Sequence, residues 1–205
     1  MSGPVHGMRS RAARILVDRR GATIADFAVV LPVMLVVILG LSDLTYQAYV
    51  QAVLTGAMQK AGRDSSLQDN STTTAGATID QQVMNQVWSV AKGATWQSSR
   101  KSYAQYGYIT PEPYEDINNN GVYDPTVDCF TDLNGNRSRD LDPGLTGQGG
   151  ANDVVVYTMT IRYTRLSPIG SIIGWSQTPT ATATTILKNQ PYATQTSAVA
   201  TRVCP

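Results

Sequence analysis

Side-chain oxygens recur at every second position within one acidic stretch of the sequence. Residues 112–142 carry eight acids against two bases. Two segments in this stretch repeat with a period of 16 residues. The oxygen-bearing residues are Asp116, Asn118, Asn120 and Asp124 in the first segment, and Asp132, Asn134, Asn136 and Asp140 in the second. Carboxylate and amide oxygens at this spacing are the ligands that hard cations prefer, so the pattern predicts a calcium site.

Each segment resembles the first half of an EF-hand or dockerin-type loop and also departs from it. Arg137 stands where the second loop should have the glycine that permits a sharp turn. The twelfth place, normally a bidentate Glu, holds Val127 or Pro143, and the neighbouring Asp128 and Asp142 are the candidate substitute ligands. The first loop is therefore the better site, and the second completes a shared site or binds nothing. The alternative is a solvated acidic loop whose Asp and Asn side chains form Asx-turns.

The chain contains two cysteines, Cys129 between the two loops and Cys204 at the penultimate position. If this part of the chain lies outside the cytoplasm, the two cysteines indicate one disulfide, which would tie the C-terminal tail to the acidic loop. Two free thiols or intermolecular links remain the alternatives.

The residue types needed for most enzyme chemistry are missing. His6 is the only histidine in 205 residues and lies in an Arg-rich segment. No Ser-His-Asp triad or His-based zinc site can therefore be built from the rest of the chain, and no catalysis is expected. Residues 1–21 hold five bases and one acid, whereas the remainder is acidic. This distribution is typical of a chain that crosses a membrane and does not favour nucleic-acid binding.

An apolar segment follows the basic head. Residues 27–41 carry no charge, and the uncharged residues 22–25 before Asp26 extend the segment to about twenty residues, which a helix needs to cross a bilayer core of about 30 Å. Apolar residues at helical spacing continue beyond it, which predicts one helix from about Thr23 to Ala61 rather than a cleaved secretory signal. The preceding arginines place the N-terminus in the cytoplasm and the rest of the chain outside.

The start of this helix carries a further motif. A basic pair precedes Gly21 and Ala22, and Asp26, Phe27 and an apolar run with an early Pro32 follow. The segment resembles the start of TadE/TadG-like pilus-assembly proteins, which are relatives of type IV pilins. The resemblance implies cleavage after Gly21 by a prepilin-type peptidase. It also implies a minor pilin or pseudopilin that acts with other such subunits and with the pilus-assembly machinery.

Asp26 has a role implied by the same resemblance. It stands where pilin-like proteins usually have Glu, and there the acid neutralises the new N-terminal amine of a neighbouring subunit. An ammonium on Ala22 and a carboxylate on Asp26 would each be costly alone in lipid, so pairing between subunits is physically reasonable. The alternative is that Asp26 sits in the headgroup layer near the positive helix N-terminus. For Pro32 a modest kink is expected.

The remaining sequence predicts a small mixed domain. Polar residues 63–78 predict a loop, a helix is expected from Ile79 to about Ala94, and strands are expected over Asp153–Arg165 and Thr180–Leu187. One face of the first strand is apolar and predicts a core: Val155, Tyr157, Met159, Ile161 and Tyr163. The apolar residues between the strands are expected in the core, with the membrane surface as the alternative: Ile169, Ile172, Ile173 and Trp175.

These observations predict an α+β protein in three parts. Residues 1–21 form a leader, residues 22–62 a transmembrane assembly helix, and residues 63–205 an extracytoplasmic domain with an antiparallel sheet and an acidic repeat loop at 112–144. The expected function is structural, in assembly of a Tad-type pilus at the bacterial cytoplasmic membrane. The alternative is a membrane-anchored, calcium-dependent binding module that does not enter a filament.

Overall fold

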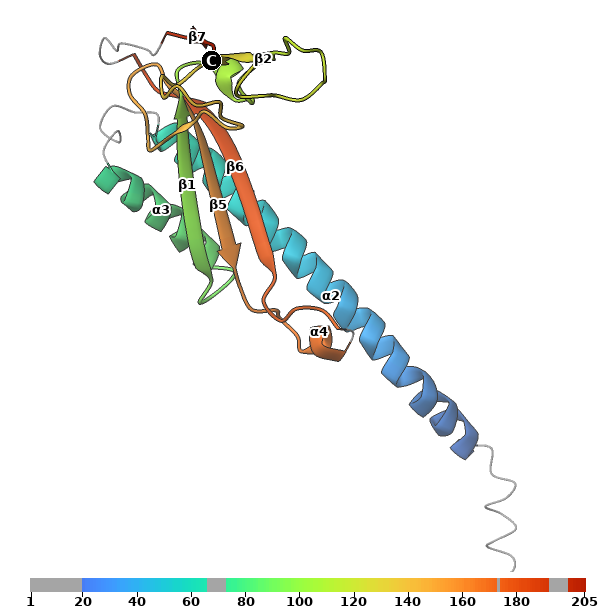
Figure 1. Cartoon of the computed structure of the whole chain (residues 1–205). Coiled ribbons are helices and arrows are strands. Elements are labelled where there is room, and N and C mark those ends of the chain that lie inside the picture. Colours follow the sequence, from blue (N-terminus) through green and yellow to red (C-terminus); the bar gives the residue numbers. More distant parts are fainter. Residues whose placement is uncertain (1–19, 66–72, 173, 192–198) are drawn as a thin grey trace, which may run out of the picture.

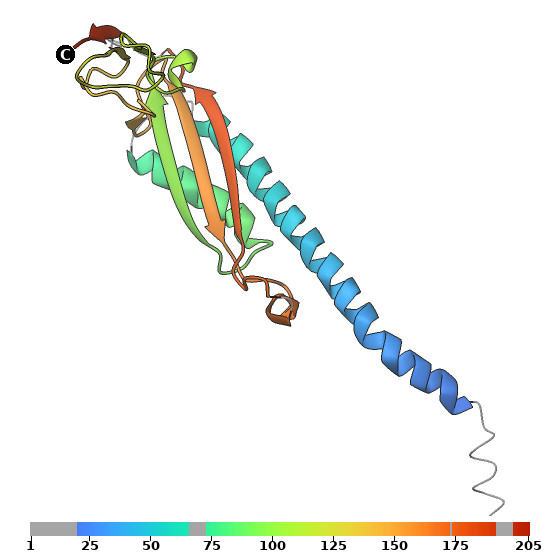
Figure 2. The same cartoon turned by 45° about the vertical axis from the view of Figure 1, so that its right-hand side comes forward.

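One long helix carries a mixed helix-and-sheet domain at its C-terminal half (Figures 1 and 2). The computed structural model describes residues 20–65, 73–172, 174–191 and 199–205. Most of the predicted leader lies outside these residues. The mixed α+β class and the antiparallel sheet expected from the sequence are confirmed.

Helix α2 (Arg20–Ser65) extends a few residues beyond both predicted ends and runs through Pro32 without interruption. Its two halves have different surroundings. The side chains from Ile24 to Leu39 are exposed, whereas Val50, Leu54 and Met58 are fully buried in the domain core. The helix is therefore both an apolar stem and a core element.

The main sheet is antiparallel and has the strand order β4-β1-β5-β6. Its strands are β1 (Thr95–Tyr103), β4 (Leu145–Thr146), β5 (Val154–Arg162) and β6 (Thr180–Lys188). β5 and β6 match the two predicted strands. The predicted core face of the first of these is confirmed, because its five apolar residues are all buried.

The predicted second helix is wrong at both ends. α3 spans Thr73–Trp88, so residues 73–78 are helical rather than loop. Its first turns lack an apolar stripe because Gly76 packs there against Arg100 of the sheet. The helix ends early because Gly93 turns the chain in a left-handed conformation (φ 73°), and the Trp88 indole N–H donates to the carbonyl of Ala94 at 2.8 Å.

Strand β1 lies inside the sheet, and the sequence pattern did not predict it. Its side chains that point toward the helices include Ser98 and Arg100, which bond to Asp80 of α3 rather than pack in an apolar layer. Because polar contacts replace hydrophobic ones there, the strand has no apolar alternation.

Helices α2 and α3 cover one face of the sheet (Figure 1). The core between them is one cluster that joins all three parts: Leu54 and Met58 from α2, Val83 and Met84 from α3, and Tyr157 and Met159 from β5. α2 thus cannot be separated from the domain without exposing this cluster.

A second, smaller sheet lies at the end of the domain farthest from the apolar half of α2 (Figure 1). It has the order β2-β3-β7, from Tyr114–Glu115, Cys129–Asp132 and Thr201–Val203. A short 3-10 helix, η2 (Tyr106–Tyr108), precedes it, and α4 (Ile169–Ile172) lies between β5 and β6. The Cys129–Cys204 disulfide is present, as expected, and ties the C-terminal strand to β3.

Candidate functional site

The first candidate site is the apolar half of α2. This helix is long and apolar enough to cross a membrane, and it is the one helix among the described residues that meets this test. The domain does not cover its apolar segment, as Figure 2 shows for the length of helix that extends away from the sheet. Such a continuous apolar surface requires lipid or other helices around it.

The residues singled out by the pilin-like motif lie at the start of this helix. Gly21 and Ala22 are helical, and Asp26 and Phe27 are exposed on the first described turns. Pro32 is also exposed, one and a half turns farther along. The motif therefore faces the surroundings of the helix rather than the protein's own core.

The second candidate site is the pair of acidic loops, which fold as conformational repeats. Asp116 accepts hydrogen bonds from the backbone N–H groups of Asn120 and Gly121, at 3.1 and 2.7 Å. Asp132 likewise accepts from the N–H of Arg137, the equivalent of Gly121, at 2.7 Å. Its other oxygen accepts from the N–H of Gly135 at 2.7 Å. The period of 16 residues seen in the sequence is thus a repeat of structure.

Backbone conformation repeats together with these bonds. The fourth place of each loop is left-handed, at Asn119 (φ 57°) and Gly135 (φ 82°). The sixth place is left-handed as well, at Gly121 (φ 80°) and Arg137 (φ 62°). Arg137 thus adopts the turn that glycine favours, at a cost of about 1 kcal/mol, so its presence does not prevent the second loop from forming.

The amide side chains close each loop onto its last acid. Asn118 and Asn120 both donate to Oδ2 of Asp124, each at 2.7 Å. Asn134 and Asn136 likewise donate to Oδ2 of Asp140, at 2.9 and 2.6 Å. The eight repeated oxygen-bearing residues are therefore brought together, four in each loop.

Two further carboxylates, one for each loop, lie in equivalent places. Asp128 accepts from the N–H groups of Ile117 and Asp124, at 2.9 and 2.8 Å. In the second loop the equivalent groups, on Leu133 and Asp140, donate to Glu112 at 2.7 and 2.8 Å.

Glu112 was missed as a site residue because it precedes both loops, whereas its equivalent Asp128 follows the first. Its side chain is fully buried, which is unusual for a glutamate and depends on these bonds. The sequence offered no spacing rule that connects Glu112 with a loop starting twenty residues later.

Asp142, considered as a substitute ligand for the second loop, has other partners. Its carboxylate pairs with Lys101 and accepts a hydrogen bond from the Tyr103 hydroxyl at 2.6 Å. Burial by itself raises the pKa of Asp142, but the bonds from Lys101 and Tyr103 outweigh it and lower that pKa. Glu112, rather than Asp142, is the carboxylate that accepts hydrogen bonds from the backbone of the second loop.

Within the described ranges, no cluster of three or more His, Cys, Asp or Glu side chains is arranged to hold a metal ion. The loops present Asn oxygens beside their acids, and in this structure those oxygens accept from backbone N–H groups, as for Asn118 with Asn120 at 3.2 Å. Calcium binding and a turn-rich acidic loop both use this set of oxygens, so the ion remains a prediction.

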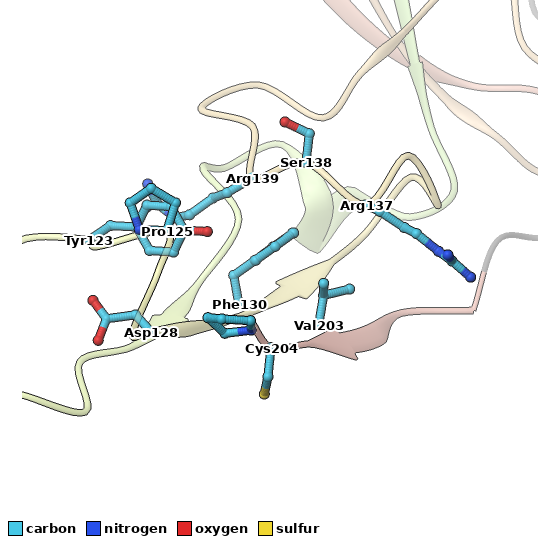
Figure 3. A pocket seen from close by; sticks show the side chains of 10 residues that line it. Tyr123, Pro125, Asp128, Phe130, Arg137, Ser138, Arg139, Val203 and Cys204 are labelled. Atoms are coloured by element: carbon cyan, nitrogen blue, oxygen red, sulfur yellow. The ribbon is translucent and has the colours of Figure 1, made fainter.

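A cavity of about 330 Å³ lies between the two loops and the C-terminal strand. Figure 3 shows Asp128 and Arg137 on opposite sides of Phe130 within its lining. Arg139, also in the lining, is held over the rings of Tyr114 and Tyr123 at 4.7 and 4.8 Å and donates to the carbonyl of Glu112. The cavity is thus built around the two loops and belongs to the same end of the domain.

Comparison with known proteins finds a family similarity at the first site. Residues 21–63 match the family model described as TadE-like protein. No curated protein and no solved structure matches the chain. The matched residues coincide with α2 and include Gly21, Asp26 and Pro32. The match confirms the resemblance drawn from these residues, and this similarity covers the N-terminal helix of the chain.

Proposed function

We propose that this chain is a minor pilin or pseudopilin that acts in the assembly of a Tad-type pilus. The observation that carries the proposal is the TadE-like match over a helix whose apolar half the domain leaves uncovered. In the membrane, lipid covers this half, and during assembly the helices of other subunits cover it. The role is structural and needs no catalytic residue.

The proposed orientation places the N-terminus inside and the domain outside. Five arginines precede the apolar segment, which favours a cytoplasmic N-terminus. The Cys129–Cys204 disulfide supports an extracytoplasmic domain, because disulfides persist in oxidising compartments.

Maturation is the second part of the proposal. A prepilin-type peptidase cuts after Gly21, and the new amine on Ala22 then pairs with Asp26 of a neighbouring subunit. Asp26 is exposed near the start of α2, so its carboxylate is accessible to a second helix. Pairing removes the cost of two separate charges in lipid.

Mass spectrometry of the mature chain tests this function. The expected mass is that of a chain beginning at Ala22, and a Gly21→Val variant should keep the precursor mass. Gly40→Val is the matched control, because Gly40 lies in the same helix with open space around its Cβ position. A wild-type chain that retains Met1, or that is cut at another bond, would overturn the proposal.

The second candidate function is a membrane-anchored, calcium-dependent binding module. The paired arrangement of Asp128 and Glu112, one completing each loop, favours it. In this case α2 is only an anchor. Replacing residues 27–41 by an unrelated apolar span separates the candidates, because an anchor retains its function and an assembly helix does not.

A further inference from the structure

The connection between β5 and β6 lies where the apolar half of α2 meets the domain. This connection, residues 163–179, includes α4, which contacts α2. In Figures 1 and 2, α4 lies beyond the end of the sheet, on the side from which the uncovered part of α2 extends. It is therefore the part of the outer domain nearest the proposed bilayer.

A buried ion pair fixes the connection to α2. Arg165 pairs with Asp43, whose side chain is fully buried, while the Arg165 side chain is 8 % exposed. The Arg165 Nε–H also donates to the carbonyl of Ser176 at 2.5 Å, so both sides of the connection are held. Asp43 lies two residues beyond Leu41, which is about 3 Å along the helix axis. The connection is thus held at the level where the apolar segment ends.

Two large apolar side chains of this connection are exposed. Leu166 is 68 % exposed and Trp175 is 40 % exposed. The core position expected for Trp175 is therefore wrong; the guanidinium of Arg165 lies 5.2 Å from its ring and helps to position it. The side chains of Ile169, Ile172 and Ile173 are not among those that the structure describes. A tryptophan with one apolar and one polar side is the side chain most typical of the bilayer interface.

Charge distinguishes this end of the domain from the other. The stretches that form it, residues 89–97 and 160–181, contain three bases and no acid. Lys92 and Arg162 are exposed, and Arg165 neutralises Asp43. The opposite end carries the acidic loops of residues 112–142. A basic end beside a membrane span complements anionic headgroups.

We infer that the 163–179 connection rests on the lipid surface, with Trp175 and Leu166 in a headgroup layer that contains anionic lipid. The contact sets the depth and tilt of the outer domain relative to the span. The inference rests on the proposed insertion of α2 in a membrane. It assigns the Arg165–Asp43 pair the role of positioning the contact.

Tryptophan quenching by brominated lipid tests the contact on the full chain reconstituted in vesicles. The brominated lipid carries bromine near the headgroup. One set of vesicles contains phosphatidylserine, and the other contains phosphatidylcholine alone. We expect quenching of tryptophan fluorescence that is lost in Trp175→Phe and retained in Trp96→Phe. Trp96 is the matched control because it is also 40 % exposed and lies at the start of β1, at the same end of the domain, but outside the 163–179 connection. Quenching should be stronger with phosphatidylserine.

The outcomes separate this inference from the proposed function. A chain that does not float with the vesicles contradicts membrane insertion itself. A chain that floats but shows the same quenching in Trp175→Phe as in wild type overturns the contact alone. Equal quenching in both vesicle types overturns the inferred preference for anionic lipid. Trp175 could instead be protected from acrylamide without being quenched by bromine. That result overturns the lipid contact and indicates that a second copy of the chain covers Trp175.

Discussion

Asp80 of α3 and Arg100 of β1 form an ion pair that joins the second helix to the sheet. Each side chain is 11 % exposed. Ser98 donates to the same carboxylate at 2.5 Å, and the Tyr157 hydroxyl donates to its other oxygen. The Arg100 guanidinium also lies 4.0 Å from the centre of the Tyr157 ring. One carboxylate thus holds together α3, β1 and β5.

Asp80→Asn should destabilise the domain by about 3 kcal/mol, because it leaves Arg100 buried without its counter-charge. Denaturant unfolding of the full chain in detergent measures the loss. Glu115→Gln is the control, because Glu115 pairs with Arg202 on the exposed surface and should change stability little. Equal losses in the two variants would contradict the structural role of Asp80.

The same carboxylate predicts a dependence on acid. Burial alone raises the pKa of Asp80, but the bonds from Arg100, Ser98 and Tyr157 outweigh it and lower that pKa below the ordinary value. Its contribution to stability is therefore complete above the unfolded pKa of about 4 and is lost as pH falls through the lower folded pKa. Unfolding midpoints measured from pH 6 downward should fall less steeply in Asp80→Asn than in wild type. If the unfolding midpoints of the two proteins fell in parallel with pH, the Asp80 carboxylate would not be the source of this dependence.

The disulfide should stabilise the outer end of the domain. Cys129 and Cys204 are 75 residues apart in the sequence, so the bond closes a long loop. The chain-entropy argument gives a stabilisation of about 4.5 kcal/mol at most for such a loop. A Cys129→Ser/Cys204→Ser variant should unfold at lower denaturant, with the acidic loops losing amide-exchange protection first. Uniform loss of protection over the whole domain would contradict this local role.

Calorimetry tests the loops for calcium. We expect binding to the wild-type chain and its loss or weakening in Asp116→Ala, because Asp116 opens the loop with glycine at its sixth place. Asp132→Ala is the matched change in the second loop and should have the smaller effect. Absence of binding heat at millimolar calcium would leave the loops as hydrogen-bonded turns.

Asp26 should be needed for assembly but not for insertion. Asp26→Ala removes the carboxylate proposed to pair with a neighbouring amine, so the chain should still fractionate with membranes while pili are lost. Asp26→Glu, which restores the usual pilin-like acid, should assemble. Normal piliation in the alanine variant would eliminate the charge-pairing role.

The sequence by itself determined the elements that carry a continuous or periodic apolar pattern. Residues 27–41 predicted the stem of α2, and the alternation from Val155 to Tyr163 predicted β5 with its buried face. The local spacing of Asp and Asn predicted both loops, since most of their hydrogen bonds join residues only two to six apart. The same local motif around Gly21 was sufficient to indicate the family.

Tertiary structure alone decided the polar and long-range contacts. β1 and the first turns of α3 are stabilised by Arg100, Asp80 and Gly76, whose contacts join segments about twenty residues apart and leave no apolar pattern. Glu112 completes a loop that begins twenty residues later, and Arg165 reaches Asp43 across most of the chain. A hydrophobic period can be read from neighbouring residues, but a polar partner is specified only when the fold brings it within hydrogen-bond distance.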